Sequence, residues 1–180
     1  MAAAATETAK GSHPFTRQFN VPVPVRDGIT LHADVFTPEA PGPFPVLVCQ
    51  TPYGKDRPTY QDDAADLASR GYVVAVVDIR GTYESEGTFI THYAAESGPQ
   101  MVEDGFDTIA WAATLPKSDG QVGTWGHSYA SWCIWHTAGG APPALKSIFA
   151  SGMSARLREM TFGLFETGRR MQCYFYMSAD

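Results

Sequence analysis

The fold of this chain is decided by one stretch of its sequence, Val122-Gly123-Thr124-Trp125-Gly126-His127-Ser128-Tyr129-Ala130. An apolar run over 122–125 predicts a strand, and the segment 128–138 that follows can form a helix. A serine on a sharp strand-to-helix turn is the layout of a nucleophile elbow, which lifts the hydroxyl above the sheet. Such a turn needs small residues two positions to either side of the serine, and here they are Gly126 and Ala130.

The same stretch has a plainer interpretation. Gly-x-Ser is common by chance, and a serine at this place can simply cap the helix that follows it. The position of the tripeptide between a strand and a helix favours the elbow, and the rest of the chain has to decide between the two.

Composition bounds the function classes. The 180 residues fit one domain with a substantial core, and 44% hydrophobic with 18% charged residues is ordinary for a globular protein. A formal net charge of −6 argues against nucleic acid as a partner, and no apolar run approaches the roughly 20 residues of a membrane span. The three cysteines lie far apart without metal-ligand spacing, so we expect buried thiols at Cys49 and Cys133 and a cytoplasmic setting.

The order of the predicted elements indicates an α/β fold with a mostly parallel sheet flanked by helices. Two alternating segments joined by Asp27-Gly28 predict an antiparallel pair, and Pro22 and Pro24 place the first of them at an edge. Buried strands and helices then alternate. The expected strands cover 16–25, 30–36, 45–50, 72–77, 122–125 and 145–150, the last also buried, and the expected helices cover 60–70, 101–114 and 128–138.

Polar residues follow three of these strands. Ligands of such sheets bind at the carboxyl ends of the strands, where Tyr53, Asp78 and Ser128 all fall. Ser128 is the candidate nucleophile. The phenol of Tyr53 and the backbone N–H of Tyr129 are candidate donors to an oxyanion, although Tyr53 can also be a loop aromatic that packs on the core.

The remaining polar residues are assigned more modest roles. None of the five histidines is placed like a catalytic base: His127 is adjacent to Ser128 but should point elsewhere, and His92 follows a loop with nothing to fix it near the site. A charged cluster in the loop after the strand at 72–77 is interpreted as ion pairs that fix the loop; it comprises Asp78, Arg80, Glu84 and Glu86. The sequence predicts no cofactor and no metal site.

Several motifs in a fixed order resemble one family, the α/β-hydrolases of the cocaine esterase and Xaa-Pro dipeptidyl-peptidase group. The resemblance runs from about Val21 to Ala150. Its components are Val25-Arg26-Asp27-Gly28-Ile29-Thr30-Leu31, Thr51-Pro52-Tyr53-Gly54-Lys55, Asp78-Ile79-Arg80-Gly81, Ser85-Glu86-Gly87, Glu103-Asp104-Gly105 and Gly120 to Tyr129. This resemblance implies that Ser128 is the acyl-forming nucleophile and that Tyr53 and Tyr129 form the oxyanion hole.

The chain departs from the family in two respects. The family usually has Gly-x-Ser-Tyr-x-Gly, and this chain has Ser131 in the last place. Family members continue beyond the strand at 145–150 with a helical cap, the last strands and the catalytic Asp and His. We therefore expect a disordered leader over 1–14, an α/β-hydrolase domain truncated before its last strands over 15–152, and the start of a cap over 153–180. The strand at 145–150 would then be an exposed, apolar edge.

These observations predict a serine hydrolase that acts on a small ester, an amide or a short peptide through an acyl-enzyme at Ser128. Without Asp and His, this chain alone should be inactive or very weak. The alternatives are a non-catalytic α/β-hydrolase-like binding module and an enzyme completed in trans. The expected partners are therefore the substrate, a complementing chain or a second copy of the chain, and neither nucleic acid nor a membrane.

Overall fold

The computed structural model describes residues 13–90 and 97–153. Apart from residues 13, 14 and 153, the predicted leader and the predicted start of a cap lie outside these ranges. The described elements are β1 (Phe15–Pro24), β2 (Thr30–Pro38), β3 (Phe44–Thr51), α1 (Pro58–Ser69), β4 (Val73–Asp78), α2 (Ser97–Ala112), β5 (Ser118–His127), α3 (Tyr129–Gly139) and β6 (Leu145–Ser151). Of these helices, none has the length and apolar character that crossing a bilayer needs.

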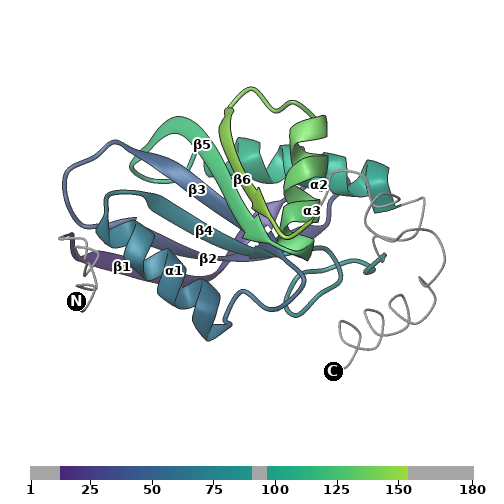
Figure 1. Cartoon of the computed structure of the whole chain (residues 1–180), viewed down its shortest axis with the longest axis horizontal. Coiled ribbons are helices and arrows are strands. Elements are labelled where there is room, and N and C mark those ends of the chain that lie inside the picture. The colour runs from purple at the N-terminus through teal and green to yellow at the C-terminus, as the bar shows by residue number, and fades with distance from the viewer. Residues whose placement is uncertain (1–12, 91–96, 154–180) are drawn as a thin grey trace, which may run out of the picture.

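The described strands form one sheet in the order β1-β2-β4-β3-β5-β6 (Figure 1). The pairs β1–β2 and β2–β4 are antiparallel, and the pairs β4–β3, β3–β5 and β5–β6 are parallel. The predicted α/β fold with a mostly parallel sheet is therefore confirmed. The expected edge position of β1 is confirmed as well, since β1 pairs with β2 alone among the described strands.

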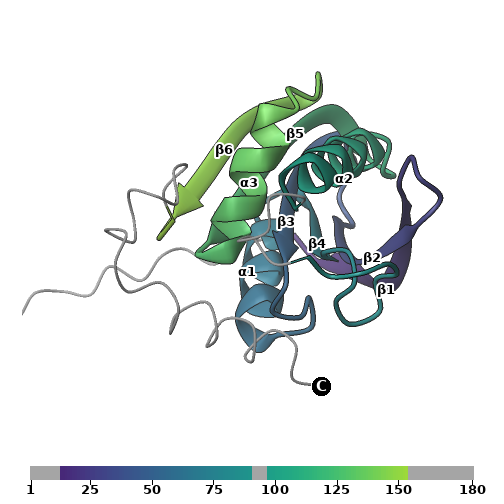
Figure 2. The ribbon, with the colours of Figure 1, turned by 90° about the vertical axis from the view of Figure 1, so that its right-hand side faces the viewer.

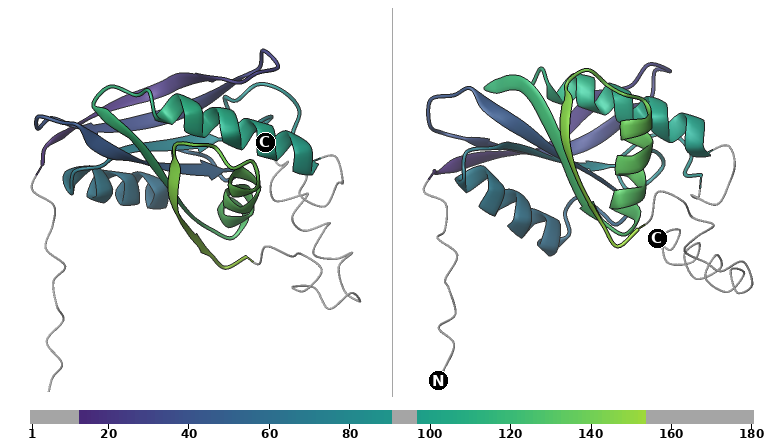
Figure 3. Two further views of the ribbon diagram at one scale, coloured as in Figure 1. Left: turned by 90° about the horizontal axis from the view of Figure 1, so that it is seen from above. Right: turned by 45° about the horizontal axis from the view of Figure 1, so that its top comes forward.

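The core lies on both faces of β4, whose six residues are all buried. Successive side chains of a strand point to opposite faces of the sheet, which explains the continuous apolar run in the sequence. Val73, Ala75 and Val77 pack with α2, and Val74 and Val76 pack with α1. Helix α3 packs against α2, and α1 covers the opposite face of the sheet (Figures 2 and 3).

A small polar network pins the two neighbouring helices to the sheet. The amide nitrogen of Gln50 in β3 donates to the Thr108 hydroxyl of α2 at 3.2 Å, and the Thr137 hydroxyl of α3 donates to the amide oxygen of Gln50 at 3.0 Å. The helices approach closely here because residue 105 is glycine: a Cβ at Gly105 would lie 2.9 Å from the Thr137 Cα. The network thus fixes how α2 and α3 sit on β3.

Two helices and one strand begin earlier in the structure than the sequence predicted. Helix α2 begins at Ser97, not at residue 101, because Pro99 lies in the first turn, where a missing N–H is tolerated. Helix α1 begins at Pro58, not at residue 60, with proline again in the first turn. Strand β5 begins at Ser118, not at residue 122, because its polar start pairs with the beginning of β3, a contact that no apolar pattern reveals.

The prediction of a buried strand at 145–150 is wrong for β6. This strand pairs only with β5 in the described part of the chain, so most of its residues are exposed. Ile148 is 40% exposed and Phe149 is 68% exposed. The expectation of burial rested on the apolar residues Leu145, Ile148 and Phe149, whereas the structure gives the strand the exposed edge position that was also expected.

We predict that Gly105→Ala destabilises the protein although alanine is the better helix former. The new methyl group must displace the Thr137 backbone and disturb the bond from Thr137 to Gln50, so the free energy of unfolding should fall by about 1–3 kcal/mol. Urea unfolding followed by circular dichroism measures this change. Gly139→Ala, in α3 with open space around its Cβ position, is the control and should be neutral or slightly stabilising.

Candidate active site

The carboxyl ends of three neighbouring parallel strands bring the predicted site residues together. Thr51, the last residue of β3, is in register with Asp78, the last residue of β4, and β5 lies on the other side of β3. The loops after β3 and β4 and the turn after β5 therefore leave the sheet at one end. Tyr53 lies on the first of these segments and Ser128 on the last.

Ser128 occupies a strained turn between β5 and α3. Its backbone has φ 58° and ψ −122°, a conformation that residues other than glycine rarely adopt. The turn is tight enough that a Cβ at Gly126 would lie 2.6 Å from the Ala130 Cβ, which explains the small residues at both positions. The Ser128 side chain makes no capping hydrogen bond to α3, so the alternative that it is only a helix cap does not describe this turn.

Tyr53 lies directly beside Ser128. Its hydroxyl oxygen is 3.2 Å from the Ser128 hydroxyl oxygen and accepts a hydrogen bond from the Tyr129 backbone N–H at 3.3 Å. The backbone N–H of Tyr53 in turn donates to the Thr51 hydroxyl at 3.0 Å, and that hydroxyl donates to the Tyr60 phenol of α1 at 3.1 Å. Tyr53, Ser128 and Tyr129, the candidate site residues of the sequence, thus lie in contact with one another.

A buried ion pair holds the loop that carries Tyr53. The Asp78 carboxylate accepts hydrogen bonds from the Lys55 backbone N–H at 2.7 Å and from its ammonium at 2.9 Å, and the same ammonium also binds Glu84. Lys55 and Asp78 are both buried. Because one carboxylate binds both the backbone and the side chain of Lys55, the loop after β3 is fixed to the end of β4.

Burial and hydrogen bonding shift the pKa values of Asp78, Lys55 and Glu84 in opposite directions. Burial raises the pKa of the Asp78 carboxyl from 3.8 to about 6, and the hydrogen bonds from Lys55 offset only part of this change. Burial lowers the pKa of Lys55, but the hydrogen bonds to Glu84 and Asp78 outweigh it, so its pKa is raised. The hydrogen bond to Lys55 holds the pKa of Glu84 below its ordinary value.

The charged loop residues serve to fix loops, as predicted. The Arg80 guanidinium makes two parallel bonds to Asp104 of α2, at 2.8 and 2.6 Å, and an ion pair with Asp27 at 2.7 Å. The Glu86 carboxylate accepts a hydrogen bond from the Thr30 backbone N–H at 2.9 Å. This group therefore ties the loop after β4 to the β1–β2 hairpin and to α2.

Comparison with known proteins assigns the family. Residues 27–170 match the family described as X-Pro dipeptidyl-peptidase (S15 family), which covers most of the chain. The chain belongs to the S15 family. It is 37% identical over 142 residues to the cocaine esterase of a Rhodococcus strain, an alignment that covers 77% of this chain and 24% of that protein. The chain thus spans about a quarter of the length of this relative.

Solved structures agree with this assignment. A CocE/NonD family hydrolase from Staphylococcus aureus is 28% identical, with a TM-score of 0.65 over 74% of this chain and 27% of that one. An α-amino acid ester hydrolase, 24% identical with a TM-score of 0.63 over 80% of this chain and 26% of that one, shares the fold. The α/β-hydrolase fold is therefore confirmed, and the relatives of this S15 chain are hydrolases.

In this S15 chain, none of the histidines within 13–90 and 97–153 bonds to Ser128. The His127 Nδ1 lies 3.1 Å from the Ser151 hydroxyl, and His136 Nδ1 contacts the Trp132 carbonyl at 2.9 Å. His32 lies in β2, and its backbone N–H donates to Ser85. His127 thus bonds to Ser151 and not to the adjacent Ser128, and His92 lies outside the described residues.

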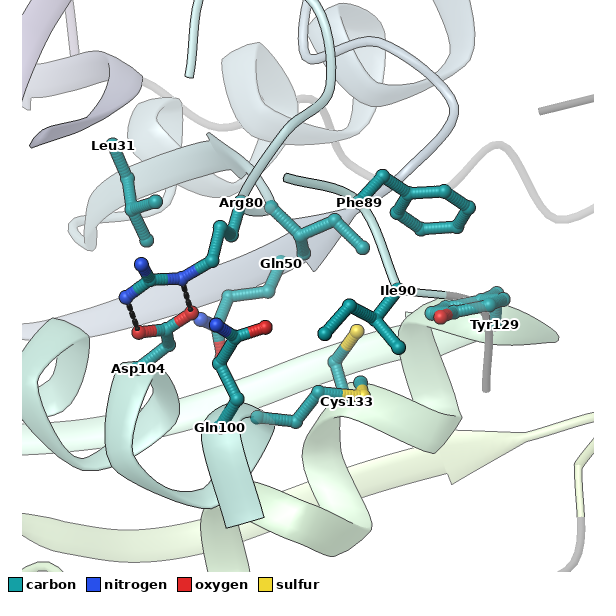
Figure 4. A pocket seen from close by; sticks show the side chains of 11 residues that line it. Leu31, Gln50, Arg80, Phe89, Ile90, Gln100, Asp104, Tyr129 and Cys133 are labelled. Atoms are coloured by element: carbon teal, nitrogen blue, oxygen red, sulfur yellow. Dashed lines mark hydrogen bonds and ion pairs between the residues drawn. The ribbon is translucent and has the colours of Figure 1, made fainter. Parts of the chain in front are cut away.

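A pocket lies beside the Tyr129 side chain, between the loop after β4 and helices α2 and α3 (Figure 4). The Arg80–Asp104 pair forms one end of it, and Phe89 and Tyr129 lie at the other. The buried, unpaired thiol of Cys133 lines its wall, and burial raises the pKa of that thiol. Cys49 is likewise a buried thiol, as predicted. No group of three potential metal ligands occurs within 13–90 and 97–153.

The sequence did not predict the ion pairs that hold the site. Lys55 stands in one motif and Asp78 in another, and the bond between them joins residues 23 positions apart. Asp104 likewise appeared in a separate motif from Arg80. The signal in the sequence for these ion pairs was that each charged residue lies next to a buried segment, where a charge needs a partner.

We predict that Asp78 makes stability depend on pH. Its pKa is higher in the folded state, so its contribution to stability is fully present below about pH 4 and is lost as pH rises through about 6. A pKa change of this size corresponds to about 3 kcal/mol. The measurement is the unfolding free energy in urea from pH 4 to 7: the stability of the wild type relative to Asp78→Asn should fall over that range.

The control for this pH series is Asp119→Asn, which makes the same substitution at an exposed carboxylate. Its unfolding free energy should follow that of the wild type across the series. Parallel curves for the wild type and Asp78→Asn would contradict the assignment.

Proposed function

We propose that this chain carries the nucleophile and the oxyanion hole of a serine hydrolase, and that the substrate is a small ester, an amide or a short peptide. The proposal depends on one observation: the Tyr53 hydroxyl lies 3.2 Å from the Ser128 hydroxyl and 3.3 Å from the Tyr129 N–H. A phenol and a backbone amide beside a strained serine are the groups that acyl transfer requires.

In the proposed reaction the Ser128 oxygen attacks the substrate carbonyl while its proton passes to a general base. The new oxygen–carbon bond displaces the carbonyl electron pair onto oxygen, and that oxyanion accepts hydrogen bonds from the Tyr53 hydroxyl and the Tyr129 N–H. The intermediate collapses to the acyl-enzyme, and the alcohol or amine leaves with the proton from the base. Water then attacks the acyl group by the same route and releases the acid.

The hydrogen bond between Tyr129 and Tyr53 has a direct meaning in this proposal. The Tyr129 N–H donates to the Tyr53 oxygen, so the two groups already lie side by side. A substrate oxygen that enters beside Ser128 can accept from both of them. The two donors are therefore arranged before the charge develops, which is how such a site lowers a barrier.

No histidine within 13–90 and 97–153 contacts Ser128. We propose that the base is a histidine held by an Asp, as the family resemblance implies. The chain also spans about a quarter of the cocaine esterase it matches. Experiments on activity therefore use the full-length gene product. We further propose a cytoplasmic setting, because Cys49 and Cys133 are buried thiols without a disulfide partner.

We predict that a fluorophosphonate probe labels the full-length protein at Ser128 and that Ser128→Ala abolishes labelling. The probe forms a bond only with an activated serine, so labelling reports the nucleophile and not the fold. Ser147→Ala, which removes an exposed hydroxyl from β6, is the control and should keep full labelling. A folded wild-type protein that takes no label would favour the binding-module alternative.

We predict that Tyr53→Phe lowers kcat on a small acyl ester by about 10²- to 10³-fold, the usual effect of removing one oxyanion donor. KM should change little, because the lost hydrogen bond forms chiefly in the transition state. Tyr72→Phe, at a half-buried tyrosine before the amino end of β4 and away from the carboxyl ends of the strands, should leave kcat unchanged. Equal activity of Tyr53→Phe and the wild type would remove Tyr53 from the proposed oxyanion hole.

A further inference from the structure

Ser131, the residue that departs from the family's usual glycine, makes contacts that no sequence pattern predicted. It lies in the first turn of α3, three residues after Ser128, and is completely buried. Its hydroxyl oxygen is 2.8 Å from the Gly126 carbonyl oxygen and 2.6 Å from the Ser151 carbonyl oxygen. It also accepts a hydrogen bond from the Ser151 N–H at 2.8 Å. One hydroxyl thus meets the backbones of β5 and β6.

Ser151, the last residue of β6, also binds the Ser128 backbone directly. The Ser128 backbone N–H donates to the Ser151 carbonyl at 2.9 Å. The Ser151 hydroxyl lies 3.1 Å from His127 Nδ1 and 3.4 Å from the Gly126 carbonyl oxygen. The residues on both sides of the turn are therefore tied to the end of β6.

Packing reinforces these bonds. Gly152, at φ 69°, lies against the His127 ring so closely that a Cβ there would be 2.6 Å from His127 Nδ1. A strained backbone such as that of Ser128 persists only where its surroundings over-determine it. The hydrogen bonds of Ser131 and Ser151 supply that constraint on the β6 side, since the Ser128 side chain makes no capping bond of its own.

We propose that Ser131 and Ser151 are positioning residues that hold the Ser128 turn, and through it the Tyr129 N–H, in reactive geometry. A hydroxyl has one proton, so Ser131 donates to one of the two carbonyls at a time and accepts from the Ser151 N–H throughout. Its removal leaves that part-buried N–H without this acceptor and frees the end of β6 from the first turn of α3. The positioning role rests on the proposed function, whereas the structural link can be tested without it.

The first measurement is hydrogen exchange of the Ser128 backbone amide in the full-length protein. Ser131→Ala should reduce the protection of this amide by ten-fold or more, because its acceptor on Ser151 is no longer fixed. Ser147→Ala, which changes the same strand away from the turn, should leave it unchanged. Unchanged protection in Ser131→Ala would overturn the proposal, whether or not the protein proves to be a hydrolase.

The second measurement is the rate of fluorophosphonate labelling, separated into reversible binding and the bond-forming step. Ser131→Ala should slow the bond-forming step about ten-fold with little change in reversible binding, and Ser151→Ala should slow it less, because its backbone bonds remain. A general loss of structure would instead lower the fraction of protein that labels. Ser131→Gly, with the residue usual in the family, is the second variant if Ser131→Ala does not fold.

The two measurements separate the possible failures. Loss of amide protection together with slower labelling supports the proposal. Loss of protection with unchanged labelling of Ser128 overturns the positioning role. If the wild type takes no label at all, the proposed function fails, and the exchange data alone then decide whether Ser131 links the turn to β6.

Discussion

The candidate site depends on one carboxylate buried at the end of the central strand. Asp78 accepts both the backbone N–H and the ammonium of Lys55, and its own carbonyl accepts the Ser85 hydroxyl at 2.7 Å. A buried carboxylate without partners is strongly disfavoured, so the loops that supply these donors must close onto β4. The loop with Tyr53 is one of them. The Tyr53 phenol reaches Ser128 because Asp78 binds Lys55, two residues further along the same loop.

The other half of the site is held by different means. Around Ser128 the constraint is tight packing, with Gly126 against Ala130 and Gly152 against His127, together with the backbone bond from Ser128 to Ser151. A positive φ at a serine costs about 1–3 kcal/mol, which the surrounding contacts must offset. The polar Tyr53 side and the packed Ser128 side meet at the Tyr53 hydroxyl, which bonds to the Ser128 hydroxyl and to the Tyr129 N–H. Small displacements on either side therefore change the same two distances.

The sequence predicted the elements that carry strong local patterns. The run at 72–77 gave the central strand, the Asp27-Gly28 dipeptide gave the hairpin, and the small residues around Ser128 gave the sharp turn. Tyr53 was placed correctly because it follows a buried strand, and ends of parallel strands meet. These inferences need only periodicity, turn chemistry and a rule for where parallel strands end.

What the sequence did not reveal are pairings between distant segments. The apolar residues Ile148 and Phe149 suggested a buried strand, but whether they are covered depends on which strands and helices pack on β6, and no local pattern shows that. The bond from Lys55 to Asp78 and the contacts of Ser131 with Ser151 join residues 23 and 20 positions apart.

The network of Gln50, Thr108 and Thr137 has a consequence for how this fold changes over evolutionary time. Each of its side chains is buried, and each hydrogen bond joins two different elements. Replacement of any one residue by an apolar side chain leaves a buried group unpaired, at a cost of about 1–3 kcal/mol. Once one of the three residues has become apolar, replacement of the others by apolar residues restores stability, because no buried polar group is then left unpaired. The three positions should therefore covary, and Gly105, which lets Thr137 come near, should covary with them.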